Sequence, residues 1–597
     1  MHDDHHDVEG AQVQAQVQVQ EAFRVPRERV RWLFLVFALL IGLVLVRIFI
    51  VQVVNSASYT EEAVAERSSA ASVAARRGDI LDVRGVPLAT SAPAGRIVAI
   101  NDLVLDKPGT AHLLAPLVQR DEAEVLAALE DPEQEWTLLA RQINPATTEQ
   151  IRALNLPGIE VDTEPSRIYP FGNFAAHVLG FTNAALEGNY GVEGQWDDVL
   201  SGTPGLVVGE RDGSGNLIGL TQSTWNAPED GATLTLTIDS AVQHMIEEIL
   251  SDVVTEQRAL GGSIIVQDSR TGAIVGMANL TSYDPNAYNE VPNPTMYLNQ
   301  SISAVYEPGS TFKAIVMAIG IDDSVVTPEM THDDAPGYAT LPDGTRIYNF
   351  EQSVWGVETM REVLQRSANL GMIFVQKQIG VARLYERLLE FGFGSPTGID
   401  LQGEEQGIVT LPDQPGWNEA LPITASFGQG VAVTPLQLVN AFSAIVNGGM
   451  LMQPYVVASV QDGDDVVETQ PTVVRQVLSA ESSETMRNML ESVVAHPDSL
   501  YPEVDGYRIG AKTGTAQIPS PDGGYIDDAT IASIVGFGPV EQPRFTVLVK
   551  IDWPKKGDTG LEVSGPALTR VFEQLFRLYG IAPSIDGDSD EATTEAP

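Results

Sequence analysis

The sequence predicts an α+β protein of several domains: a single N-terminal transmembrane helix, an elongated mixed α/β pedestal, and a larger domain of helices around an antiparallel sheet. Three observations predict this fold class. Residues 32–54 form one apolar segment long enough to cross a bilayer. Strand-like segments occur at both ends of the C-terminal half, with helical segments between them. The length of 597 residues is sufficient for more than one hydrophobic core.

The composition excludes several classes of function. With 35 basic and 80 acidic residues, the formal net charge is −45, so no nucleic acid is expected as a partner. The chain has no cysteine, which removes disulfides, thiolate catalysis and cysteine metal sites. The eight histidines show no His-Glu-x-x-His spacing. We therefore expect neither a metal nor an organic cofactor.

The N-terminal segment predicts a cytoplasmic tail followed by an uncleaved membrane anchor. Residues 1–31 are polar, with a Val-Gln alternation over 12–20, and are expected to be disordered. Residues 32–54 would span about 34 Å as a helix. Four arginines precede this segment and none follows it before Arg67, which predicts an N-terminus in the cytoplasm. Arg47 either extends to the outer interface or contacts a partner's transmembrane helix.

Residues 55–228 are expected to form the pedestal, with no catalytic constellation. Residues 55–76 are rich in Ala, Ser and Glu and predict a helical stalk. Residues 76–89 predict an extended segment around a glycine turn, and mixed helices and strands are expected over 90–225. The expected role of this part is packing or spacing.

Residues 229–582 predict a domain built on one five-stranded antiparallel sheet. Strands of this half of the chain are expected at 233–238, 263–267, 274–278, 507–518, 529–537 and 545–551. A helix capped by Asp239 and a helix over 566–579 should face the sheet, and the helical segments of 310–395 should form a separate all-helical lobe. The acidic tail, residues 583–597, should be disordered.

A first candidate site lies in the segment Glu307–Lys313, which precedes the apolar run 314–321. Pro308 and Gly309 predict a helix start, and Ser310 and Lys313 would share one face of that helix. The amine can accept the hydroxyl proton if burial or a second cation lowers its pKa. The helix N-terminus adds positive potential where an oxyanion would form. Alone, the pair also fits a capped helix with a solvated lysine.

A second candidate motif is Ser367-Ala368-Asn369, 57 residues after Ser310 and between two predicted helices. A loop at this place can present a hydroxyl and a carboxamide together. The Ser367 hydroxyl can pass a proton, and the Asn369 amide can hold a peptide backbone.

The third motif is Lys512-Thr513-Gly514-Thr515, on the predicted strand 507–518. A cation and two hydroxyls lie along one strand, and Gly514 would let a substrate backbone approach closely. Such a strand can pair with an extended peptide and neutralise its terminal carboxylate.

The order of the three motifs is far more specific than any one of them, and it is typical of penicillin-binding proteins and serine β-lactamases. A competing hypothesis is a nucleotide site, because residues 506–513 miss a phosphate-binding loop by one residue, Ala511. That loop requires a helix directly after it, whereas turn-forming residues follow here at 519–524. Nucleotide binding is therefore not expected.

The chain resembles a class B penicillin-binding protein from its anchor to about residue 580. The segments that carry the resemblance are 77–82, 283–286, 306–313, 397–401 and 512–517. Ser426–Gly430 and Thr434–Gln437 are more similar to the division (septal, FtsI-type) branch than to the elongation branch. The chain departs from the family at Val83–Gly85, which replaces Arg-Asn-Gly, and at Ala511, which replaces a common glycine.

The resemblance implies D,D-transpeptidation of peptidoglycan stem peptides that end in D-Ala-D-Ala. In that reaction Ser310 attacks the penultimate D-Ala carbonyl, and Lys313 acts as the base. Ser367 relays a proton to the leaving D-Ala, and Asn369 binds the donor peptide.

The resemblance further implies that Lys512, Thr513 and Thr515, with Gly514 between them, hold the terminal carboxylate. The backbone N–H groups of Ser310 and Thr515 would form the oxyanion hole. β-Lactams would be trapped at Ser310.

The family resemblance also implies that residues 55–228 are a domain of the dimerisation type, and it implies partners and a location. A polytopic glycan polymerase and other division proteins are expected to bind through the transmembrane helix and the pedestal. The bulk of the chain is expected outside the cytoplasm, anchored by one span in the plasma membrane. Alternatives are an elongation-type transpeptidase, a β-lactam sensor or a catalytically silent division scaffold. The anchor and the pedestal argue against a β-lactamase.

Overall fold

The computed structural model describes most of the chain, namely residues 27–57, 59, 68–210, 224–497, 499–501, 503–520 and 523–584. The Val-Gln run and nearly all of the acidic tail lie outside the described residues. The chain divides into two compact units. One comprises Met1–Ala74 and Pro204–Pro228, and the other Ala75–Thr203 and Glu229–Pro597.

The first unit contains the predicted membrane helix. Helix α2 covers Arg27–Phe49 and continues as the π-helix η1, Ile50–Val54. Among the described residues, Glu28–Val54 is the one helix long and apolar enough to cross a membrane, with a mean hydropathy of 3.0. The helix begins five residues before the predicted start at residue 32, because the preceding charged residues continue it as a polar turn.

The predicted helical stalk over 55–76 is wrong for residues 68–73. Residues Ser68–Val73 form strand β1, which pairs antiparallel with β8, Gly205–Glu210. Strand β9, Thr224–Asn226, pairs with β8 on its other side. Alanine favours a helix, but these residues offer no apolar stripe with a 3.6-residue period, and the ladder to β8 satisfies their backbone groups instead.

In the second unit, the extended segment around a glycine turn is confirmed. The short strand β2, Ile80–Leu81, leads through Gly85 at φ +81° into the long strand β3, Pro87–Ile100. Strand β3 pairs with β4 and β5, and three helices pack on this sheet around a core that includes Ile97 and Leu114. The bounds of these elements are β4 Trp136–Ile143, β5 Ile159–Ile168, α4 Lys107–Val118, α5 Glu122–Glu130 and α6 Pro145–Ala153.

The pedestal sheet also contains strands from the C-terminal half. Its order is β19-β18-β10-β2-β3-β4, with β5 on β3. The predicted strand at 233–238 is confirmed as β10, Thr233–Leu236, which pairs with β2 and with β18, Val457–Asp462. Strand β19, Asp465–Glu468, completes this sheet at one edge. Segments more than 350 residues apart in sequence are therefore held in one sheet.

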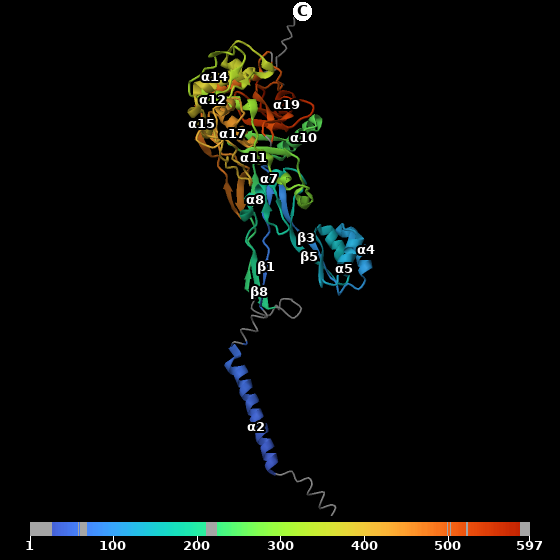
Figure 1. The fold of residues 1–597 in the computed structure, drawn as a ribbon. Helices are drawn as coiled ribbons and strands as arrows, with labels where there is room; N and C mark the ends of the chain where they lie inside the picture. The colour runs from blue at the N-terminus through green and yellow to red at the C-terminus, as the bar shows by residue number, and fades with distance from the viewer. Residues whose placement is uncertain are drawn as a thin grey trace, which may run out of the picture. The chain divides into compact units, whose positions relative to one another are not determined.

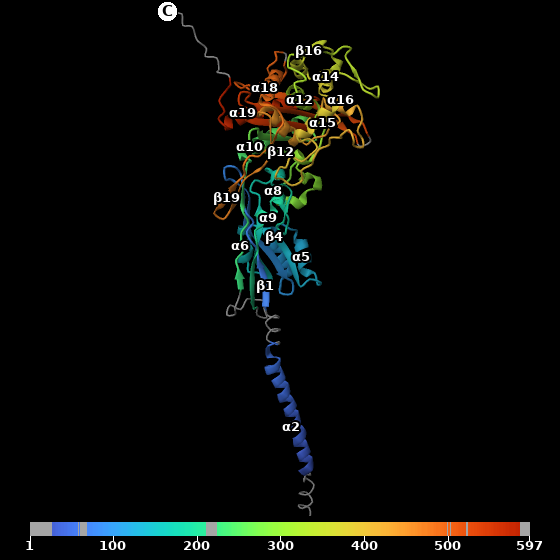
Figure 2. The same ribbon diagram turned by 90° about the vertical axis from the view of Figure 1, so that its left-hand side faces the viewer.

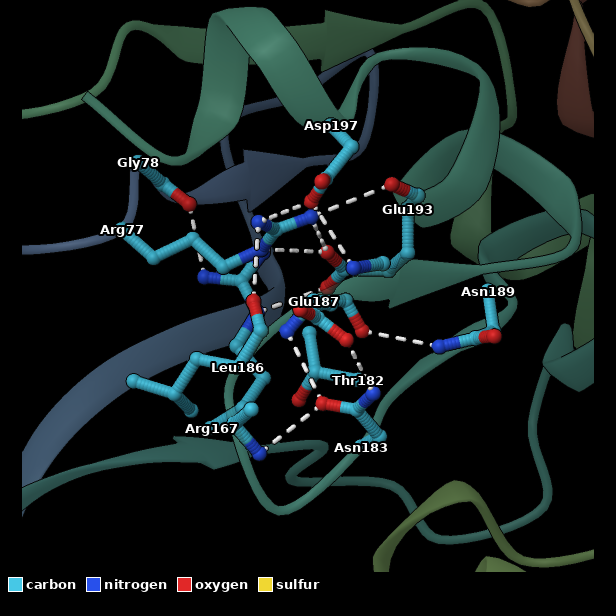
Figure 3. Close-up of polar contacts among 12 residues, drawn as sticks. Arg77, Gly78, Arg167, Thr182, Asn183, Leu186, Glu187, Asn189, Glu193 and Asp197 are labelled. Atoms are coloured by element: carbon cyan, nitrogen blue, oxygen red, sulfur yellow. Dashed lines mark hydrogen bonds and ion pairs between the residues drawn. The ribbon is translucent and has the colours of Figure 1, made fainter. Parts of the chain in front are cut away.

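A cluster of four charged side chains, three of them buried, joins distant parts of the pedestal (Figure 3). Glu193 is 0% exposed and accepts hydrogen bonds of 2.7 Å from both Arg77 Nε and Arg167 Nε. Arg77 also pairs with Asp197 at 2.6 Å, and the Tyr169 hydroxyl donates to Glu193 at 3.2 Å. The Glu193 carboxylate is thus shared by two guanidinium groups, a geometry that offsets the desolvation of the charges.

The five-stranded antiparallel sheet is confirmed, with the order β12-β11-β23-β22-β21. One face packs on helices α10 and α19 through residues such as Ile264 and Phe572, and the other packs on the helical lobe through residues such as Ile265. The bounds are β11 Gly261–Asp268, β12 Ile274–Leu280, β21 Gly510–Pro519, β22 Tyr525–Gly538, β23 Phe545–Asp552, α10 Ser240–Gln257 and α19 Gly560–Leu578.

The last helix starts earlier than predicted. Thr559 caps α19 by accepting the Glu562 amide, so the helix begins at Gly560 and not at Pro566. Pro566 lies inside the helix, where the sequence favoured it as a first residue. Asp239 caps α10 as predicted, since it accepts the Ala241 amide.

The all-helical lobe lies on the face of the sheet opposite α10 and α19, as both views show (Figures 1 and 2). Its central helix α12, Lys313–Asp322, is buried from Lys313 to Gly320, which confirms a helix buried on all sides. The short strand pair β13, Thr331–Asp333, and β16, Val357–Thr359, was not predicted. The surrounding helices are α13 Met360–Gln365, α14 Asn369–Ile379, α15 Val381–Glu390, α17 Pro435–Val446 and α18 Ala480–Val494.

Candidate active site

Ser310 lies on a 3-10 turn, Gly309–Phe312, that leads directly into α12. Gly309 adopts φ +56°, and its amide donates to the Gly428 carbonyl at 3.1 Å. A side chain at Gly309 would lie 2.9 Å from the Thr515 carbonyl, so the turn packs closely on strand β21. Ser310 itself, the second residue of this turn, is half-buried.

The carboxylate of Glu307 fixes the turn that carries Ser310 from its N-terminal side. It accepts the Gly430 amide at 2.7 Å and the Tyr525 hydroxyl at 2.9 Å. These partners belong to the loop before α17 and to strand β22. The position of the Ser310 hydroxyl therefore depends on three segments far apart in the sequence.

Two buried lysines meet at the Ser367 hydroxyl. Lys313 and Lys512 are both 0% exposed, and each Nζ lies 3.1 Å from Ser367 Oγ. Lys313 also donates to the Ser367 carbonyl, and no hydrogen bond joins it to Ser310 in the described structure. Ser367 adopts φ +55°, a conformation that costs a non-glycine residue about 1–3 kcal/mol and is typical of functional sites.

The two amines have strongly lowered proton affinities. Burial lowers the pKa of Lys512 to about 7. Burial also lowers the pKa of Lys313 well below its usual range, and the neighbouring charge of Lys512 lowers it further. The buried carboxylate of Glu358 acts in the opposite sense and raises the pKa of Lys313. A neutral amine close to Ser310 is thus accessible without alkaline conditions.

Asn369 is the first residue of α14, at one side of the same site. Its Nδ2 donates to the Tyr348 carbonyl at 2.9 Å, which fixes the orientation of the side chain. The amide oxygen is the end that remains for a ligand N–H.

Strand β21 forms the opposite wall and is the edge strand of its sheet. Thr513 and Thr515 face the site, and the Thr515 hydroxyl accepts the Gly560 amide at 3.1 Å. Gly514 faces the other way: a side chain there would lie 2.8 Å from the Pro308 carbonyl. The predicted role of Gly514 is therefore corrected, because the missing side chain makes room for the Ser310 turn and not for a substrate backbone.

These elements enclose one cavity of about 550 Å³. Its lining includes five of the predicted residues, together with Phe350, Leu500 and Tyr501; the five are Ser310, Ser367, Asn369, Thr513 and Thr515. Lys313 and Lys512 lie beneath the lining, at Ser367. The three motifs thus converge on a single site. Among the described residues, no group of three His, Asp or Glu side chains could hold a metal ion.

Several site residues were missed from the sequence. Glu307 and Tyr525 fix the Ser310 turn, and Tyr501 contacts Thr513. Glu307 adjoins the motif, so its position was a usable signal. Tyr501 lies in a segment without any motif, and nothing in the sequence places it near strand β21. Glu358 was missed because an acidic residue is normally expected at the surface.

The geometry defines a class of protein. A serine at the start of a buried helix, two amines of lowered pKa and a strand edge bearing hydroxyls suit acyl transfer through a serine, with a carboxylate-bearing ligand held beside the strand.

Comparison with known families agrees with this class. Residues 262–575 match the penicillin binding protein transpeptidase domain, and residues 72–236 match the penicillin-binding protein dimerisation domain. The chain belongs to the class B penicillin-binding proteins and is a serine D,D-transpeptidase.

Individual relatives cover most of the chain. It is 35% identical over 514 residues to stage V sporulation protein D of Bacillus subtilis, covering 85% of this chain and 79% of the relative. It is 31% identical over 572 residues to the peptidoglycan D,D-transpeptidase FtsI of Escherichia coli K12, covering 93% and 94%. Both relatives therefore share the pedestal as well as the catalytic part.

Two solved structures share the fold. A peptidoglycan synthetase from Bifidobacterium adolescentis superposes with a TM-score of 0.69 at 26% identity, covering 87% of this chain and 98% of that one. Penicillin binding protein 2X from Streptococcus thermophilus superposes with a TM-score of 0.71 at 24% identity, covering 86% and 81%. The second comparison bears on the fold alone.

Proposed function

We propose that this chain cross-links peptidoglycan stem peptides through an acyl-enzyme on Ser310, in the synthesis of the division septum. The observation that carries the proposal is the convergence of Ser310, Lys313, Ser367 and Lys512 at one cavity. The names of the relatives support the reaction, and the similarity of Ser426–Gly430 to the division branch supports the septal role.

In the proposed acylation, neutral Lys313 accepts the proton of Ser310 as the hydroxyl attacks the penultimate D-Ala carbonyl. The backbone N–H groups of Ser310 and Thr515 stabilise the oxyanion. Ser367 then passes a proton to the amine of the leaving D-Ala, and its contacts with both lysines suit such a relay. An amine of a second stem peptide attacks the acyl-enzyme and closes the cross-link.

The terminal carboxylate of the donor peptide is assigned to Thr513 and Thr515, which line the cavity. Lys512 lies beneath the lining, so its contribution is the field of its charge rather than direct contact. The Asn369 amide oxygen accepts a backbone N–H of the donor peptide.

The location and the partners are also proposed. The four arginines that precede the apolar segment 32–54 support a cytoplasmic N-terminus, with the pedestal and catalytic part outside. The family resemblance supports assembly with a polytopic glycan polymerase through α2 and the pedestal. The similarity to a protein named for stage V of sporulation favours a second candidate role, cross-linking of spore peptidoglycan. Depletion of the chain in growing cells separates the two, because a septal enzyme gives filaments and a spore enzyme leaves division intact.

The activity can be tested directly on the purified full chain. With a glycan polymerase and lipid-linked precursor, we expect cross-linked dimers of stem peptides and release of free D-Ala. Fluorescent penicillin should label the chain and remain bound for many minutes. Rapid loss of the label would indicate a β-lactamase, labelling without cross-links a sensor, and no labelling a scaffold.

The pH dependence of acylation should respond in opposite directions to two substitutions. Lys313 must be neutral to act as a base, so acylation falls at low pH as Lys313 becomes protonated. Lys512→Met removes a positive neighbour, raises the pKa of Lys313 and should move this acidic limb to higher pH. Glu358→Gln removes a negative neighbour and should move the limb to lower pH.

The measurement is the second-order rate of labelling by fluorescent penicillin between pH 5 and pH 9, normalised to each variant's own maximum. Glu329→Gln is the matched control, because its carboxylate is 76% exposed and pairs with Arg361 at the surface. Shifts of the same sign in both variants would contradict the assignment of Lys313 as the base.

A further inference from the structure

Tyr501 is a residue of the cavity wall that the transpeptidase motifs do not include. Its hydroxyl lies 2.8 Å from Thr513 Oγ1 and accepts the Thr513 backbone N–H at 3.1 Å. Tyr501 and Thr513 both line the cavity. The ring packs against both hydrophobic cores that flank the sheet, which fixes the position of the hydroxyl.

The two contacts decide how the hydroxyl protons can be arranged. One lone pair of the Tyr501 oxygen is occupied by the Thr513 N–H. Burial raises the pKa of Tyr501, so the phenol keeps its proton and has a proton to donate. When that proton is donated to Thr513 Oγ1, the proton of Thr513 is left free to point into the cavity. A carboxylate in the cavity requires such a donor and is repelled by lone pairs.

We propose that Tyr501 is a positioning residue that sets the Thr513 hydroxyl as a hydrogen-bond donor to the terminal carboxylate of the acyl donor. The inference rests on the proposed function, since it concerns the same substrate end. Tyr501 then contributes to the selectivity of the cavity for ligands with a free carboxylate over ligands with a neutral end.

The position of Tyr501 on the edge strand has a related effect. The Thr513 N–H points away from β22, because it is bonded to Tyr501 and not to the neighbouring strand. Backbone groups alternate along a strand, so the N–H of Thr515 points to the same open side. The Tyr501 hydroxyl occupies the N–H of Thr513 and leaves the N–H of Thr515 available to a ligand.

The test compares benzylpenicillin, which has a free carboxylate, with its methyl ester, which has none. Intact-mass spectrometry of the full chain follows acylation by each compound over time. In Tyr501→Phe we expect the acid-to-ester ratio of acylation rates to fall about 3- to 10-fold, the effect of losing one well-placed hydrogen bond. Acylation by the ester should change little.

Two further variants make the test specific. Tyr507→Phe is the matched control, because it too removes a hydrogen-bonded tyrosine hydroxyl, one that donates to the Ile581 carbonyl away from the cavity lining. Its acid-to-ester ratio should equal that of the wild type. In a Thr513→Val background, adding Tyr501→Phe should lower the ratio no further, since Tyr501 acts through the Thr513 hydroxyl.

Two outcomes would overturn the proposal. An unchanged acid-to-ester ratio in Tyr501→Phe, including one that results from an equal loss of both rates, would remove the link to the carboxylate and leave Tyr501 a packing role alone. Full additivity in the double variant would show that it does not act through Thr513. Failure of the wild type to form any adduct with benzylpenicillin would instead refute the proposed function, so the two failures are distinguishable.

Discussion

Replacement of Ser310 by alanine is expected to abolish the covalent penicillin adduct and all cross-linking. The cavity contains other hydroxyls, but their oxygens are already engaged. Ser367 is bonded by two lysines, Thr513 by Tyr501, and Thr515 by the Gly560 amide. Among the described residues, Ser310 has no hydrogen-bond partner for its side chain. It lies in the 3-10 turn that leads into the buried helix α12. Without the Ser310 oxygen, no acyl-enzyme ester can form.

The measurement is gel fluorescence and intact mass after incubation with fluorescent penicillin. Ser303→Ala is the control, because Ser303 precedes the same turn and its hydroxyl donates to the Asn299 carbonyl. It should be labelled like the wild type. An adduct of unchanged yield in Ser310→Ala, mapped to another residue, would refute the assignment of the nucleophile.

Replacement of Glu193 by glutamine is expected to destabilise the chain by about 3–5 kcal/mol, the usual cost of removing one partner from a buried ion pair. The substitution preserves the shape of the side chain. Within the described part of the chain, it leaves Arg167 without a carboxylate partner and Arg77 with Asp197 alone. Arg167 is 1% exposed, so water cannot readily replace the lost charge.

Urea unfolding of the full chain in detergent, followed by tryptophan fluorescence, measures this effect. Trp196 is adjacent to Asp197 and reports on the cluster directly. Asp252→Asn is the control, because its ion pair with Arg570 has side chains 53% and 41% exposed; its expected effect is about 0–1 kcal/mol. A loss as small as that of the control would show that the cluster contributes little to stability.

The sequence predicts much of this fold because its strongest patterns are local. The apolar segment of α2, the hairpin of β11 and β12, and the cap of α10 by Asp239 all follow from period, composition or capping chemistry. The errors arise where distant partners override these preferences. Strand β1 is a strand only because β8 lies beside it. Pro566 is tolerated inside α19 because Thr559 begins the helix earlier.

The candidate site likewise combines features that local patterns predict with features that only distant contacts determine. Order and spacing bring the three motifs to attention, but they do not indicate that Lys512 lies beneath the cavity or that Gly514 faces the Ser310 turn. Both facts depend on how β21 packs on the turn before α12, which is a property of the tertiary structure. Tyr501, Glu358 and Glu193 could not be predicted, since each is defined only by its neighbours.

The order of strands in the catalytic sheet has a consequence for biogenesis. Strand β23 is the last of this sheet's strands to be synthesised, and it lies at the centre of the sheet between β11 and β22. Until residues 545–552 emerge, the early hairpin and the late hairpin each present an unpaired edge to solvent. The catalytic half therefore cannot complete its fold until residues 545–552 have been synthesised. A product truncated before Phe545 is expected to aggregate or to be degraded by proteases, and not to retain partial activity.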